Sequence, residues 1–78
     1  MNESVKIEII GHTDNSGSES RNQQLSLKRA GSVGEYLKKH GINPLRISQK
    51  GYGAQKPIKP NVSEENRKLN RRIEFRIL

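Results

Sequence analysis

The sequence predicts a small mixed α/β domain, an α+β sandwich in which a long helix covers one sheet. Three observations support this class: a β-branched run over residues 5–10, an apolar pattern at helical spacing over about residues 20–40, and an alternation of apolar and charged residues over 72–77. A strand, a helix and a strand in that order form a right-handed crossover, so the first two strands should be parallel. Residues 1–78 are expected to form one domain with a thin core, because such a short chain buries only about 60 to 65% of its unfolded surface.

The first strand is expected over residues 5–10, where alternate residues from Val5 onward should face the core. Gly11 ends the run, and residues 14–17 have the composition of a tight turn. The strand therefore delivers Asp14 to a loop at its carboxyl end. Open α/β sheets usually hold their ligands at this position.

A long helix should begin near Ser20, whose hydroxyl would cap it in a capping box with Gln23. It should end near His40, with Gly41 just beyond the last turn. The stripe expected to pack on the sheet consists of Leu27, Ala30, Val33, Gly34 and Leu37.

A second stripe on this helix comprises Asn22, Leu25, Ser26 and Arg29, which recur at intervals of three and four residues. Helical side chains lean toward the N-terminus, so Arg29 should project back toward the loop after the first strand. Asp14 and Arg29 are therefore expected to converge.

The second half of the chain should complete the same sheet. A short second strand is expected over residues 46–50, after a turn that includes one turn of 3₁₀ helix. Ser63 can cap a brief helix that runs to about Asn70. The final, antiparallel strand should cover residues 72–77, and its core-facing residues are expected to be Ile73, Phe75 and Ile77.

Composition narrows the possible partners. Fifteen Lys and Arg against eight Asp and Glu give a formal charge of +7, which favours anionic partners, including nucleic acid. However, the three aromatic residues are not interleaved with the basic ones as a base-stacking platform requires. There is no cysteine, residues 1–4 do not resemble a signal peptide, and no apolar run approaches the roughly 18 residues of a membrane span.

The sequence contains no recognisable set of catalytic residues. His12 and Asp14 resemble a metal pair or a base with its orienting acid, but a catalytic zinc site normally needs three protein ligands. The other histidine, His40, stands at the far end of the predicted helix. Without a cysteine, a nucleophile elbow or a phosphate-binding loop, we expect neither an enzyme nor a cofactor.

Four motifs give the chain a resemblance to a known family. They are GHTDNSG at 11–17, NQQLSLKRA at 22–30, GYG at 51–53 and NRRIE at 70–74. In this order they resemble the OmpA-like domain, a peptidoglycan-binding module of bacterial envelope proteins, over about residues 5–78. The resemblance implies a non-enzymatic domain in the periplasm that anchors an outer-membrane or envelope protein to the cell wall.

The resemblance also implies a binding site. In that family the aspartate of HTD and the arginine of LSxxRA hold the free amino-acid end of diaminopimelate in the stem peptide, and these match Asp14 and Arg29. We expect the two to pair with each other when no ligand is bound. The remaining residues that the resemblance places at the site are Thr13, Asn22, Leu25 and one of the arginines Arg71 and Arg72.

The chain departs from the family pattern at its start. The usual domain has another strand and helix before the GHTD strand, whereas four residues precede Val5 here. We therefore expect the domain to be truncated on its N-terminal side. A sheet without its first strand exposes an unpaired edge, so self-association is also expected, although Lys6 and Glu8 oppose it.

Overall fold

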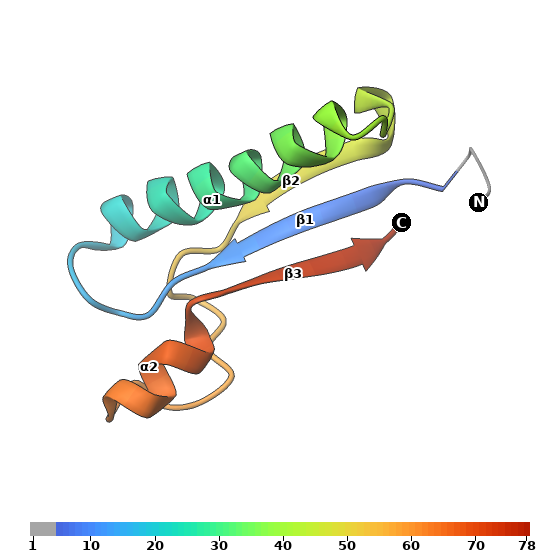
Figure 1. Ribbon diagram of the computed structural model, residues 1–78. Coiled ribbons are helices and arrows are strands. Elements are labelled where there is room, and N and C mark those ends of the chain that lie inside the picture. Colours follow the sequence, from blue (N-terminus) through green and yellow to red (C-terminus); the bar gives the residue numbers. More distant parts are fainter. Residues whose placement is uncertain (1–4) are drawn as a thin grey trace.

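The computed structural model describes residues 5–78, and Figure 1 shows one long helix lying along a small sheet with a short helix beyond the end of that sheet. Residues 1–4, which do not resemble a signal peptide, lie outside the described residues. In chain order the elements are β1 (Ile7–His12), α1 (Glu19–Lys39), a 3₁₀ helix (Pro44–Arg46), β2 (Ile47–Gly51), α2 (Glu64–Asn70) and β3 (Arg72–Ile77).

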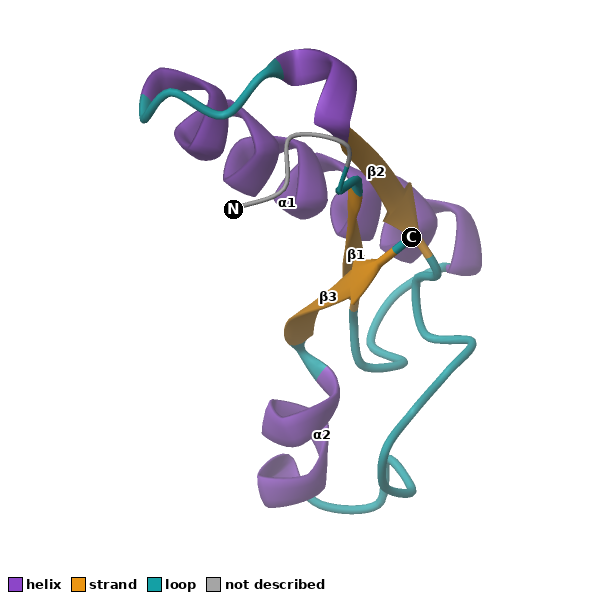
Figure 2. Cartoon of the chain, turned by 90° about the vertical axis from the view of Figure 1, so that its right-hand side faces the viewer, coloured by secondary structure: helices purple, strands orange, loops and turns teal. Residues whose placement is uncertain are grey.

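The three strands form one mixed sheet in the order β2-β1-β3. β1 runs parallel to β2 and antiparallel to β3, and Ile9 lies opposite Gln49 on one side and Phe75 on the other. The predicted crossover, short second helix and final antiparallel strand are therefore confirmed. Figure 2 shows that α2 and the loop before it extend beyond the end of the sheet at which β1 finishes. Among residues 5–78, no helix is long and apolar enough to cross a membrane.

The face of α1 that packs on the sheet differs from the predicted stripe. Its buried residues are Asn22, Ser26, Ala30 and Gly34, whereas Leu27 is 46% exposed. The physical reason is the close approach of the helix to β1 and β2. A Cβ on Gly11 would overlap the backbone carbonyl of Ser26, so only small side chains fit between these elements.

The beginning of α1 also differs from the prediction. The helix starts at Glu19, and its N-cap is Ser18, whose side chain accepts a hydrogen bond from the Arg21 N–H. Gln23 does not reach back in a capping box, because its amide donates to the Gly51 carbonyl at the end of β2. The capping-box prediction was therefore wrong. Sequence pattern alone did not separate two nearby serines of equal capping ability.

The two serines give a direct test of the cap. Ser18→Ala removes the acceptor of the Arg21 N–H and should lower the free energy of unfolding by about 1 kcal/mol. Ser20→Ala is the matched control and should change it by less than about 0.5 kcal/mol, as is usual for surface substitutions. Urea unfolding followed by circular dichroism measures both. Equal losses from the two variants would contradict this cap.

The apolar side of β3 is not buried as predicted. Phe75 is 58% exposed and Ile77 is 67% exposed, while Ile73 is partly buried. The three residues lie on the same face of the sheet as Ile9, which is completely buried under α1. α1 packs against β1 and β2 and leaves β3 uncovered. Alternation identified the apolar face correctly, but nothing among the described residues covers it.

Candidate functional site

The loop after β1 is folded tightly against the end of β2. Thr13 donates its backbone N–H to the Gly53 carbonyl at 2.8 Å, and its hydroxyl donates to the Asp14 carbonyl at 2.8 Å. Thr13 and Asp14 are only 3% and 6% exposed. Thr13 therefore shapes the loop, and the loop holds the Asp14 carboxylate in one position.

The Asp14 carboxylate has two partners. The Ser16 N–H donates to Oδ1 at 2.9 Å, and Arg71 Nη1 donates to Oδ2 at 2.6 Å. Burial by itself raises the pKa of the Asp14 carboxyl, but the hydrogen bonds from Ser16 and Arg71 outweigh burial and hold this pKa below its usual value. Asp14 is consequently ionised throughout the neutral pH range.

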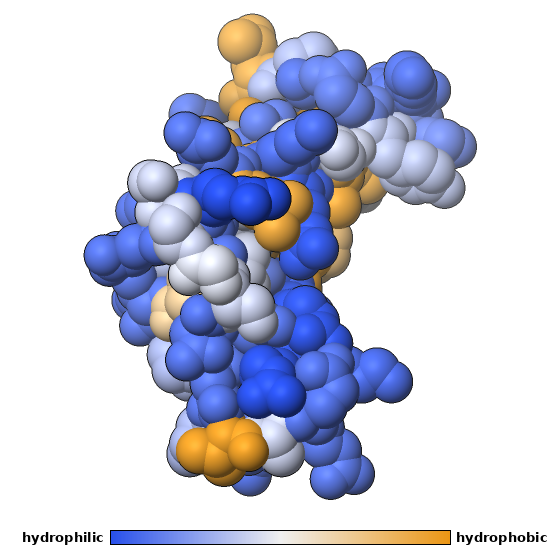
Figure 3. Space-filling view, turned by 90° about the vertical axis from the view of Figure 1, so that its left-hand side faces the viewer, coloured by the Kyte–Doolittle hydropathy of each residue, from blue (hydrophilic) through white to orange (hydrophobic). Residues whose placement is uncertain are grey.

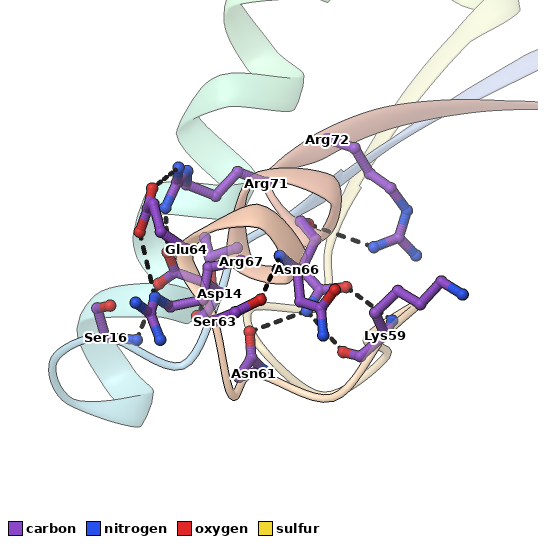
Figure 4. A network of polar contacts seen from close by, with 12 residues as sticks. Asp14, Ser16, Lys59, Asn61, Ser63, Glu64, Asn66, Arg67, Arg71 and Arg72 are labelled. Atoms are coloured by element: carbon purple, nitrogen blue, oxygen red, sulfur yellow. Dashed lines mark hydrogen bonds and ion pairs between the residues drawn. The ribbon is translucent and has the colours of Figure 1, made fainter.

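Arg71 is the partner of Asp14, and the predicted pairing of Asp14 with Arg29 is not formed. Arg71 stands between α2 and β3, and β3 places the adjacent Arg72 opposite His12 at the end of β1. This pairing brings Arg71 next to the β1 loop, although 57 residues separate it from Asp14. Arg71 Nη2 also contacts Glu64 Oε1 at 2.6 Å, which the close-up in Figure 4 shows. Sequence reasoning missed Glu64 as a member of this network.

Arg29 belongs to a second group of arginines. Its side chain is exposed and makes no ion pair with any of residues 5–78. A hollow of about 350 Å³ is lined by Arg29, Arg71, Arg72 and Ile73. Arg72 is held in place by Glu74, 2.6 Å from its Nε, and by the Lys56 carbonyl. The hollow therefore offers a guanidinium that no acidic side chain of residues 5–78 pairs with, close to the arginine that binds Asp14.

Asn22 and Leu25 line another hollow, of about 490 Å³, over the first turns of α1. Asn22 is only 6% exposed, and its side-chain amide makes no hydrogen bond within the described part of the chain. Its polar atoms are not among the buried unpaired atoms of the described residues, so they keep contact with solvent and are available to a polar ligand group. The other residues that line this hollow are Ser16, Gly17, Arg21, Gln24 and Lys28.

Asp14 is connected to both hollows. Ser16, which donates to one carboxylate oxygen, lines the hollow of about 490 Å³. Arg71, which donates to the other oxygen, lines the hollow of about 350 Å³. The end of the molecule that carries the β1 loop and α2 presents a predominantly hydrophilic surface (Figure 3). Asn22 and Leu25 line one of these hollows, and Arg29, Arg71 and Arg72 line the other. Of these residues, only Arg71 contacts the Asp14 carboxylate directly.

Asn70, which sequence reasoning did not assign to the site, supports the two arginines that follow it. It is fully buried and accepts hydrogen bonds from the Ile58 and Lys59 N–H groups at 2.7 and 3.2 Å. Its amide donates to the Lys59 carbonyl and to the Asn61 side chain, both at 2.8 Å. One side chain therefore joins the loop before α2 to the start of β3.

His12, at the end of β1, is a buried packing residue. It is 2% exposed, stacks on Tyr52 with ring centroids 5.7 Å apart, and has its Nε2 3.3 Å from a Glu74 oxygen. Burial, with the nearby Arg72 charge, lowers its pKa, so the neutral ring is favoured. Among residues 5–78, no three His, Asp or Glu side chains are grouped to hold a metal ion.

The fold and the site together define a class. The module is a small α/β domain in which the loop after β1 holds an ionised carboxylate against the Arg71 guanidinium, and residues that contact this carboxylate line two hollows open to solvent. This arrangement suits recognition of a small ligand that carries charges of both signs.

Comparison with known proteins then assigns the family. The OmpA family profile matches residues 1–71, and the chain belongs to the OmpA family. It is 43% identical over 70 residues to outer membrane porin F of Pseudomonas fluorescens, covering 90% of this chain and 22% of that protein. It is 42% identical over 71 residues to the peptidoglycan-binding protein ArfA of Mycobacterium tuberculosis, covering 91% of this chain and again 22% of that protein.

Solved structures agree with this assignment. The C-terminal domain of Helicobacter pylori MotB superimposes with a TM-score of 0.93 at 35% identity, over 100% of this chain and 60% of that one. The predicted resemblance and the predicted fold class are therefore confirmed. The chain spans 22% of each of these two sequence relatives and 60% of the MotB domain.

Proposed function

We propose that this chain binds peptidoglycan non-covalently, by holding the amino-acid end of a stem peptide between Asp14 and Arg29. The observation that carries the proposal is the buried, ionised Asp14 carboxylate, whose partner Arg71 shares a hollow with the exposed Arg29. A free amino-acid end needs a carboxylate for its ammonium and a guanidinium for its own carboxylate. The family supports this proposal, since one relative is itself named a peptidoglycan-binding protein.

The Arg71 contact suggests how the ligand enters. The ligand ammonium would take over the Asp14 oxygen that Arg71 now occupies at 2.6 Å. Arg71 would keep its second partner, Glu64, and so would not be left without a counter-charge. The exchange replaces one ion pair by another, so the net gain in free energy is modest and selectivity for the zwitterion is the main result.

Thr13, Asn22 and Leu25 have supporting roles in this proposal. Thr13 holds the loop, the free amide of Asn22 offers hydrogen bonds to the peptide, and Leu25 provides apolar contact in the same hollow. Diaminopimelate is the proposed stem residue, because its second amino-acid centre supplies both charges. Lysine or ornithine stems offer a similar ammonium and are the alternatives that a binding assay must separate.

The module acts as an anchor and makes or breaks no bond. We place it in the periplasm, attached to a membrane-associated parent protein, because its relatives carry names such as outer membrane porin and outer-membrane lipoprotein. Its role would be to tie that parent to the cell wall.

A second candidate function is the binding of nucleic acid or another polyanion. The charge of +7 and the hollow lined by three arginines favour it. Polyanion affinity falls steeply with salt, by roughly one log unit of affinity per log unit of salt for each phosphate neutralised. Recognition of one zwitterion should depend far less on salt, so the two functions differ in a measurable way.

A pull-down with purified sacculi and with duplex DNA, each at two salt concentrations, tests the proposal. We expect the chain to sediment with sacculi at both concentrations and to leave DNA at the higher one. Free diaminopimelate at high concentration should release the chain from sacculi. Salt-sensitive retention on DNA, with no retention on sacculi, would establish the polyanion function instead.

A further inference from the structure

The hollow over the first turns of α1 carries positive charge that the proposed contacts of Asp14 and Arg29 do not use. Arg21 and Lys28 both line this hollow, and both side chains are exposed. Neither forms an ion pair with another of residues 5–78. No acidic side chain is among the other residues that line it, which are Ser16, Gly17, Asn22, Gln24 and Leu25. As far as the structure describes it, the hollow is therefore suited to an anionic group.

Asn22 adds a hydrogen-bond donor to the same hollow. The residue is almost completely buried, and its side-chain amide has no hydrogen-bond partner among residues 5–78. Its polar atoms nevertheless keep contact with solvent in the hollow. An amide, a guanidinium and an ammonium all donate N–H groups, and a guanidinium forms paired hydrogen bonds with the two oxygens of a carboxylate. The chemistry of the lining therefore favours a carboxylate as the anionic group.

The hollow lies within reach of a peptide that is held at Asp14 and Arg29. Leu25 lines this hollow, and Arg29, four residues later on α1, lines the hollow of about 350 Å³. Residues four apart on a helix have Cβ atoms about 5 to 6 Å apart, and an extended peptide advances about 3.3 to 3.6 Å per residue. The residue next to the bound amino-acid end can therefore place its own carboxylate in the hollow of Arg21 and Lys28.

We propose that this hollow binds a second carboxylate of the stem peptide, carried by the residue that is joined to the diamino acid. Arg21 and Lys28 supply the opposite charges, and the Asn22 amide donates a hydrogen bond. The inference rests on the proposed function and adds a specificity to it: the module distinguishes a stem peptide in which this carboxylate is free from one in which it is amidated. The Asp14 and Arg29 contacts are common to both forms.

Two synthetic peptides test this specificity. Both contain diaminopimelate, and they differ only in whether the adjoining residue carries a carboxylate or a carboxamide. The wild-type protein should bind the carboxylate form about three- to tenfold more tightly, because each exposed ion pair contributes a factor of up to about 5. Isothermal titration gives the two dissociation constants, and their ratio measures the preference.

Charge removal in the hollow should abolish the preference. In the double variant Arg21→Gln/Lys28→Gln the ratio of the two dissociation constants should fall to about one. The control Lys39→Gln/Lys68→Gln removes the same charge at exposed positions that line neither hollow, and it should keep the wild-type ratio. Equal wild-type affinity for both peptides, with both weakened in Asp14→Asn, would overturn this inference alone, as would a preference that survives in the double variant. Failure of the wild type to bind either peptide would overturn the proposed function and this inference with it.

Discussion

Asp14→Asn is expected to lower the affinity for a stem peptide that ends in diaminopimelate by about 30- to 5,000-fold. The asparagine is close in size to aspartate and can still accept the Ser16 N–H, so the loop should keep its shape. The charge that would hold the ligand ammonium is lost, and truncating one half of a desolvated charge pair costs about 2 to 5 kcal/mol. Isothermal titration with the purified peptide measures the change.

Arg29→Ala should produce a loss toward the lower end of that range, because the Arg29 guanidinium is exposed and solvent weakens its contact. The matched control is Arg67→Ala, which removes an arginine of α2 that lines neither hollow. Arg67→Ala should bind the peptide as the wild type does. Wild-type affinity in both Asp14→Asn and Arg29→Ala would show that these residues are not the site.

The pH dependence of binding follows from the direction of the Asp14 shift. Its pKa is held below the usual value, because hydrogen bonds to the carboxylate outweigh the effect of burial. The carboxylate therefore stays charged as pH falls from 8 to 5, and affinity should be flat over this window. The stability that Asp14 contributes is present above its unfolded pKa of about 3.9 and is lost as pH falls through the lower folded value.

The sequence was sufficient for the architecture because each element carries a local signal. The β-branched run predicts β1, although the strand begins at Ile7 and continues through Gly11 to His12. Ser63 caps α2 as predicted, and the alternation over β3 gives its bounds directly. The features that the sequence pattern predicted incorrectly also have a physical cause. The buried stripe of α1 is made of small and polar residues, since Gly11 lets the helix approach the sheet too closely for Leu27 to fit beneath it.

The site could be predicted only in part, for a similar reason. The residues of one loop and one helix, such as Asp14 and Arg29, are placed by local pattern. The ion pair between Asp14 and Arg71 depends on where α2 docks, which no short-range pattern encodes. Alternation shows that Phe75 faces the α1 side of the sheet, but it does not show how far along the sheet the helix extends.

Asn70→Ala is expected to lower the free energy of unfolding by roughly 3 kcal/mol. Asn70 is fully buried, and its side chain makes four hydrogen bonds to the loop over residues 58–61. Removing it leaves the Ile58 and Lys59 N–H groups without their acceptor, and each buried group left unpaired costs about 1 to 3 kcal/mol. For two such groups the cost is about 2 to 6 kcal/mol, and the total falls in the lower part of this range, because the loop residues themselves are largely exposed to solvent.

Asn66→Ala is the matched control, since Asn66 lies one turn earlier in α2 and its side chain makes no hydrogen bond to a residue that the structure describes. It should change the free energy of unfolding by less than about 0.5 kcal/mol. Urea unfolding measures both variants, and peptide titration adds a second readout, because Asn70 fixes the start of the segment that carries Arg71 and Arg72. If Asn70→Ala unfolded at the same urea concentration as Asn66→Ala, the loop before α2 would not depend on Asn70. Loss of peptide affinity without loss of stability would instead show that Asn70 acts chiefly by positioning these two arginines.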